Sequence, residues 1–217
     1  NNNGGFLNVA AGRSVAGTGG HVSLTSGVGT ATSSGLIKIS TPNAGSTASG
    51  TDGVSGHLTF SSGTTTKGSS GELKVGTGTS TKGKGGSISI TVGTGNTVVG
   101  GVVTVISGTG ATDGGAITVN SGVGTLGVGG AVGLTAGNGA TTGGAFTITS
   151  GTGTAAVGGA ITVTAGQGGA DGGDTSIIAG ISDGDTNNNG GFLNVAAGRS
   201  VAGTGGHVSL TSGVGTA

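Results

Sequence analysis

The chain has 217 residues, of which 58 are glycine and only 6% are charged, and its formal net charge is zero. This balance, with four Phe and neither Trp nor Tyr, argues against a nucleic-acid-binding protein, whose surface needs clustered basic and aromatic side chains. The lack of cysteine excludes disulfides and thiolate metal sites, and no apolar run is long enough to span a membrane.

One pattern repeats along the whole chain and overturns the low-complexity interpretation that so much glycine would favour. A glycine, often the second of a pair, is followed by apolar residues at offsets +2 and +4 and by another glycine at +7. The pattern starts at Gly5, Gly20, Gly35, Gly56, Gly71, Gly86, Gly101, Gly115, Gly130, Gly144, Gly159, Gly173, Gly191 and Gly206. Glycine at offsets 0 and +7 is expected where φ is positive or where a Cβ has no room.

The alternation within each repeat predicts a β-strand with one buried face. Leu7 and Val9 occupy offsets +2 and +4 in the first repeat, and the side chains at +2, +4 and +6 are expected to point inward. A unit of about 15 residues buries too little apolar surface to fold alone, so it must stack on its copies. The sequence therefore predicts an all-β fold, a β-solenoid (β-helix) of stacked 14–15-residue rungs with strands about 4.8 Å apart.

A longer repeat lies above the short one. Asn1–Ala31 is identical to Asn187–Ala217, so residues 1–186 form one long tandem repeat and 187–217 begin the next identical copy. We expect residues 1–217 to form one continuous solenoid segment of a longer array, because neither end carries a changed, capping pattern. Two insertions, Pro42–Val54 and Ile181–Asn189, break the even spacing and are predicted to be loops.

Charge is segregated along the long repeat. Residues 5–100 carry six basic and two acidic side chains, a net charge of +4, whereas residues 101–190 carry five aspartates and no basic residue, a net charge of −5. Two parallel copies offset by half a repeat would therefore place unlike charges side by side.

Sequence motifs give no support for catalysis. His21, His57 and His207 each stand at offset +1 beside a glycine, without a sequence signature of a catalytic partner. The stretch Gly122–Gly127 matches the dinucleotide-binding pattern G-x-G-x-x-G, but the helix that should follow it is not predicted. We therefore expect no enzyme activity and no bound cofactor.

An acidic stretch in the second insertion suggests a calcium loop. Asp183, Asp185 and Asn187 place oxygen side chains at alternate positions, as in the opening of D-x-[DN]-x-[DN] loops, and calcium prefers such ligands. The glycine expected at the sixth place and the acidic residue expected at the twelfth are missing. A polar turn without metal is the competing interpretation.

Rows of threonine suggest a second type of binding surface. Thr147 and Thr149 precede Thr162 and Thr164 at the same offsets, +3 and +5, and stacking would set these pairs in a flat array that resembles those of ice-binding β-solenoids. The competing explanation is that threonine is a good strand former where one face meets water.

Two segments, Gly19–Gly35 and Val54–Gly63, are rich in glycine, serine and threonine and resemble repeats of large secreted proteins in diatoms and related algae. The chain is similar, more loosely, to filamentous parts of bacterial adhesins. The resemblance implies an extracellular or cell-surface protein with a structural, adhesive or matrix-forming role, whose partners are neighbouring copies of itself in a fibre. Glycans on such a chain would be O-linked to Ser or Thr, because no N-x-[ST] site occurs. The expected function is thus a structural extracellular filament, with an ice-binding module as the alternative.

Overall fold

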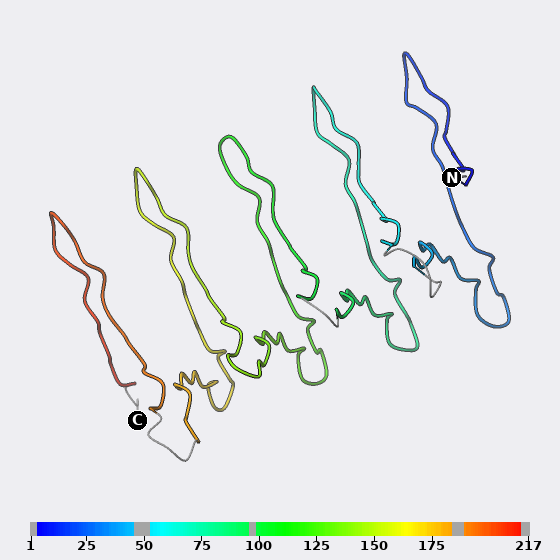
Figure 1. Ribbon diagram of the computed structural model, residues 1–217. Coiled ribbons are helices and arrows are strands. Elements are labelled where there is room, and N and C mark those ends of the chain that lie inside the picture. The colour runs from blue at the N-terminus through cyan, green and yellow to red at the C-terminus, as the bar shows by residue number, and fades with distance from the viewer. Residues whose placement is uncertain (1–3, 46–52, 96–98, 184–188, 214–217) are drawn as a thin grey trace. The chain divides into compact units, whose positions relative to one another are not determined.

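The computed structural model describes residues 4–45, 53–95, 99–183 and 189–213. Within these ranges it contains neither helix nor strand, and Figure 1 accordingly shows a plain tube of extended stretches and bends. The chain divides into two units, Asn1–Ile106 (unit 1) and Ser107–Ala217 (unit 2). Each unit is built from the same repeat.

The prediction of an all-β β-solenoid is therefore wrong. A strand exists only when its backbone groups pair with those of a neighbouring segment. In the described part of the chain, every backbone–backbone hydrogen bond joins two glycines at the ends of one loop, and none joins successive rungs. The alternation of apolar residues indicates which side chains share a side, but it does not determine where a partner segment lies.

The described residues also lack a core. None of them is buried, and the exposed surface of 21312 Å² far exceeds the roughly 8,500 Å² of a compact monomer of this size. The apolar side chains at +2 and +4, which the solenoid would have buried, remain largely in water. The burial that stacking was expected to supply is therefore missing from the isolated chain.

The repeat pattern nevertheless persists in the degree of exposure. Ile161 at offset +2 is 55% exposed and Val163 at +4 is 73% exposed, whereas Val157 in the preceding loop is 93% exposed. The most protected offset is +6, and its half-buried members are Ser26, Thr41, Ser107, Ala136, Ser150, Ala165 and Ala179. The offsets expected to point inward are thus the most protected positions, although none is buried.

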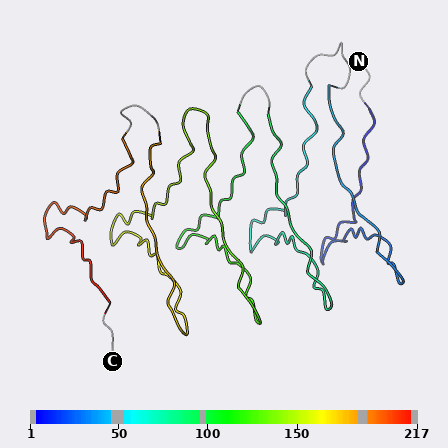
Figure 2. The same cartoon turned by 90° about the horizontal axis from the view of Figure 1, so that it is seen from below.

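Each well-defined loop is closed by one backbone hydrogen bond between glycines. The N–H of the glycine at offset 0 donates to the carbonyl oxygen of the preceding glycine at +7, at 2.8–2.9 Å. In the described residues these pairs are Gly20 and Gly12, Gly35 and Gly27, Gly115 and Gly108, Gly130 and Gly122, Gly144 and Gly137, Gly159 and Gly151, Gly173 and Gly166, Gly191 and Gly180, and Gly206 and Gly198. Figure 2 shows the looped path of the chain from a second direction.

The loops, and not the alternating stretches, absorb the variation in repeat length. The stretch from offset 0 to +7 has the same length in each repeat, whereas the two bonded glycines stand 7, 8 or 11 residues apart. The longest separation, between Gly180 and Gly191, contains the insertion Ile181–Asn189. The base of the other insertion is also narrow, since a Cβ on Gly53 would lie 3.3 Å from the backbone nitrogen of Gly45.

Space explains the glycine at offset 0. A Cβ on Gly130 would lie 3.3 Å from both the nitrogen of Gly122 and the Cβ of Ser121. The glycine at +7 has no such constraint, because a Cβ on Gly122 would meet nothing within 4 Å. Among the described glycines, positive φ occurs only at Gly45 and Gly68, so the expectation of positive φ at offsets 0 and +7 is wrong.

The loop tips at offset +9 come in two chemical kinds. Where this residue is glycine, the backbone passes very close to it: a Cβ on Gly124 would lie 2.7 Å from the carbonyl carbon of Val128. Where it is serine, the hydroxyl accepts a backbone hydrogen bond, as Ser14 Oγ does from Gly17 at 2.9 Å and Ser200 Oγ from Gly203 at 2.8 Å. The tip is therefore tightened either by close backbone approach or by a side-chain acceptor.

A hydroxyl at offset +6 adds a second bond to some loops. Ser26 Oγ donates to the carbonyl of Gly35 at 2.9 Å, and Ser150 Oγ donates to that of Gly159 at 2.8 Å. Thr77 makes the same bond to Gly86 at 3.2 Å. Alanine at +6 lacks this donor, so the bond supplements the glycine closure and is not needed for it.

Candidate functional site

The described residues present no concave site. No pocket is found in them, and no three His, Asp or Glu side chains come together as a group that could hold a metal ion. Candidate functions must therefore be sought on the exposed surface that the repeat creates.

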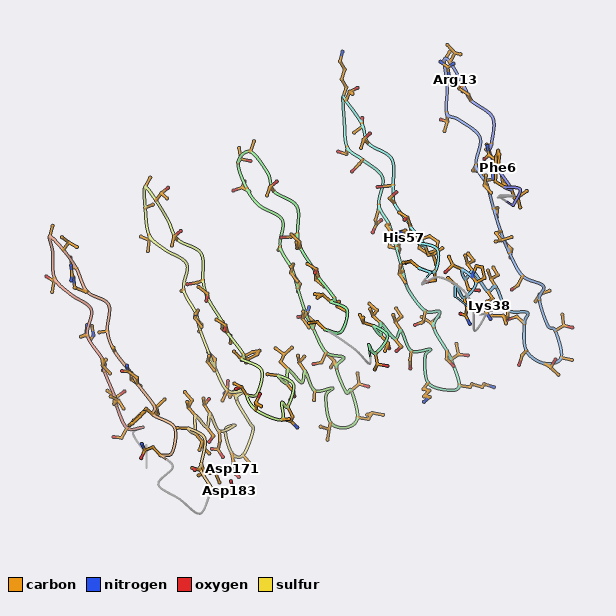
Figure 3. All side chains as sticks on the ribbon, viewed as in Figure 1. Phe6, Arg13, Lys38, His57, Asp171 and Asp183 are labelled. Atoms are coloured by element: carbon orange, nitrogen blue, oxygen red, sulfur yellow. The ribbon has the colours of Figure 1, made fainter. Side chains whose placement is uncertain are left out.

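The predicted calcium ligands are only partly covered by the structure. Asp183 is exposed at the edge of a described range, whereas Asp185 and Asn187 lie outside the described residues. Figure 3 labels Asp183 and the nearby-in-sequence Asp171, both on exposed backbone. The calcium loop stays a prediction.

Calcium binding can be tested directly on this loop. If Asp183, Asp185 and Asn187 hold the ion, millimolar calcium should slow proteolysis within residues 181–189, because a ligand that binds only the folded loop stabilises it. Limited proteolysis followed by mass spectrometry would measure the cleavage rate. The variant Asp183→Asn with Asp185→Asn is the control, and equal cleavage in calcium and in chelator would leave only the polar turn.

The three histidines occupy the predicted offset without further chemistry around them. His21, His57 and His207 are exposed, and none of the described hydrogen bonds or ion pairs involves an imidazole. His57 is labelled in Figure 3. The sequence prediction that these residues lack a catalytic partner is consistent with this arrangement.

The charged side chains are nearly all separate from one another in the described ranges. The one ion pair found there joins Lys74 Nζ to Glu72 Oε2 at 3.5 Å, with both side chains more than 70% exposed. Such a surface pair contributes less than about 1 kcal/mol. The remaining basic and acidic groups are therefore available for contacts outside their own loop.

The most extensive chemical feature is the set of apolar side chains at offsets +2 and +4, which we name the apolar rows. In unit 2 these are Ile117, Val119, Val132, Leu134, Phe146, Ile148, Ile161, Val163, Ile177, Leu193, Val195, Val208 and Leu210, each roughly half or more exposed. Apolar groups gathered on a surface mark sites of association. Sequence reasoning assigned these residues to a core and missed their exposure; the signal was the lack of any second apolar segment to cover them.

The threonines of the ice-binding prediction are also on the surface. Thr147, Thr149, Thr162 and Thr164 are exposed, and the neighbouring-offset hydroxyls of Ser89 and Thr91 lie 3.3 Å apart in a similar stretch. A flat array requires fixed spacing between successive rows, which the missing ladder would have supplied. The threonine surface stays a prediction.

No segment of the described residues forms a helix with the length and apolar character needed to cross a membrane. No protein-family model matches the chain, and neither a curated protein nor a solved structure is significantly similar to it.

Proposed function

We propose that this chain is a structural, non-catalytic segment of an extracellular or cell-surface protein that assembles with copies of itself into fibres. The observation that carries the proposal is the apolar rows, which recur in repeat after repeat and stay exposed. A surface that repeats along a chain offers the same contact many times, which suits assembly better than recognition of one small ligand.

Self-association would supply the burial that the isolated chain lacks. Covering one apolar side chain that is about half exposed contributes roughly 1–2 kcal/mol, and each repeat provides two of them. Association must offset lost translational and rotational freedom, so a single repeat is not enough. Many repeats in parallel exceed that cost, and assembly is therefore expected to be cooperative.

The tandem organisation supports the same proposal. The identical stretches Asn1–Ala31 and Asn187–Ala217 show that the chain reuses one design over a spacing of 186 residues. The resemblance to secreted algal repeats implies an adhesive or matrix-forming setting, in which exposed Ser and Thr could carry O-linked glycans.

Assembly can be measured on the 217-residue chain itself. Sedimentation velocity over a range of concentrations should show a sharp rise in size above a threshold, and electron micrographs of the same samples should show elongated particles. A single monomeric species at every concentration, with no fibres in the micrographs, would overturn the proposed function.

Ice binding is the alternative function, favoured by the exposure of Thr147, Thr149, Thr162 and Thr164. If these side chains bind ice, the chain should show thermal hysteresis, and Thr149→Lys with Thr164→Lys should remove it because two large, hydrated groups would interrupt the surface. A nanolitre osmometer measures this difference between melting and freezing points. The control is Thr112→Lys with Thr142→Lys, which changes the same residue types within loops; absence of hysteresis in the unaltered chain would end this alternative.

A further inference from the structure

We infer that the loop tips set the alignment between copies, with the basic tips of unit 1 in one copy contacting the acidic tips of unit 2 in another. The residues are Lys67 and Lys82 on the first surface and Asp113 and Asp171 on the second. This inference rests on the proposed self-assembly and names the chemistry that fixes its register. The occupant of each charged surface is thus a second copy of this chain.

The first observation is that the structural division of the chain coincides with a change in the sign of its charge. Unit 1 contains six basic and two acidic residues, a net charge of +4, whereas unit 2 contains one basic and five acidic residues, a net charge of −4. The boundary between Ile106 and Ser107 falls between the last lysine, Lys84, and the first aspartate of unit 2, Asp113. The two units are therefore electrostatically complementary.

The second observation is where the charges lie in the repeat. Lys67 and Lys82 stand at offset +11, within the bends at 66–68 and 81–83. Asp171 stands at offset +12 within the bend at 169–171, and Asp113 stands at the same offset directly after the bend at 111–112. The two charge signs thus occupy nearly the same place in the loop, one sign in each unit.

The tip charges are free to meet a partner. All four side chains are exposed, and none of them takes part in the ion pair found among the described residues. Figure 3 shows the same kind of position for Arg13, whose side chain lies at the far end of its loop in unit 1. Because the tips project from the repeat, they can touch another copy while the apolar rows are also engaged.

Electrostatics at such tips governs alignment more than affinity. An exposed ion pair contributes little by itself, but like charges placed opposite one another oppose contact. Alignment of unit 1 on unit 1 would set lysine against lysine, and alignment of unit 2 on unit 2 would set aspartate against aspartate. Only the staggered arrangement, unit 1 on unit 2, brings unlike charges together.

A charge-swap experiment tests this register. Lys67→Glu with Lys82→Glu makes the tips of both units acidic, and Asp113→Lys with Asp171→Lys makes the tips of both units basic. Each variant alone should require about fivefold higher concentration to assemble in low salt, and an equimolar mixture of the two should restore the wild-type threshold. In about 1 M sodium chloride, where charges are screened beyond roughly 3 Å, the three samples should behave alike.

The matched control is Lys38→Glu with Lys74→Glu, which makes the same change in net charge at offset +3, away from the tips. Its threshold should shift less than that of the tip variant. Cross-linking of a mixture of isotopically light and heavy chains should yield Lys–Asp links between light and heavy copies.

The outcomes separate this inference from the proposed function. A wild-type chain that forms fibres, together with tip variants that assemble equally well or are not rescued by mixing, would overturn the alignment while leaving assembly intact. Cross-links confined to single chains would overturn it as well. A wild-type chain that forms no fibres in any salt would instead remove the proposed function on which the alignment rests.

Discussion

Gly139→Ala should open the loop between Gly137 and Gly144. In the closed loop a Cβ at residue 139 would overlap the carbonyl group of Thr142, whose carbon would lie only 2.9 Å away. That neighbour is backbone and cannot move aside without changing the turn. We expect the hydrogen bond from the Gly144 N–H to the Gly137 carbonyl, now 2.8 Å long, to be lost. Amide hydrogen exchange at Gly144 should then be at least about fivefold faster.

The control for this substitution lies two residues away. A Cβ on Gly137 would meet nothing within 4 Å, and this glycine is not among those with positive φ. Gly137→Ala should therefore leave exchange at Gly144 unchanged or slightly slower, since alanine restricts the open chain. Equal exchange rates in the two variants would contradict the close backbone approach at the tip.

Ile148→Asp should raise the concentration needed for assembly by roughly 5- to 30-fold. Ile148 is 62% exposed in the single chain, so a carboxylate there is well hydrated and the loops of the monomer should persist. Between copies the same position would be covered, and the substitution would remove about 1–2 kcal/mol of apolar burial and add a charge that must be desolvated. The threshold can be measured by sedimentation.

Thr147→Asp provides the comparison, because it places the same charge on the adjacent residue outside the apolar rows. Its threshold should change by less than about threefold, within the range of ordinary surface substitutions. If both aspartates raise the threshold equally, net charge rather than the apolar rows controls association. If neither does, the apolar rows are not the contact surface.

Much of the local organisation could be predicted from the sequence. The glycines at offsets 0 and +7, such as Gly130 and Gly122, are the two partners of the closing hydrogen bond. The insertion Ile181–Asn189 falls between a bonded pair, as the loop prediction requires. These features depend on neighbours within one repeat, and a periodic sequence states such short-range relationships directly.

The long-range part of the prediction failed for a physical reason. Alternation of residues such as Phe146 and Thr147 favours an extended backbone, but a ladder also needs a second segment at hydrogen-bonding distance. Two medium apolar side chains per repeat provide little burial against the entropy of ordering about 15 residues. The same residues therefore remain exposed instead of forming a core.

The candidate sites divide along the same line. The segregation of charge was visible in the sequence, whereas the placement of Lys67, Lys82 and Asp171 within bends became evident only from the path of the chain. Exposure of the apolar rows could not be read from composition, because the same pattern is expected of a buried strand face.

The closing bond between Gly180 and Gly191 has an evolutionary consequence. It keeps the length found in shorter loops, 2.8 Å, although it spans 11 residues instead of 7 or 8. Mutations that lengthen or shorten a loop are therefore tolerated as long as the two glycines survive, and neighbouring repeats need no compensating change. Selection could thus alter what a loop displays, residue by residue, while duplication extends the chain at no structural penalty to the repeats already present.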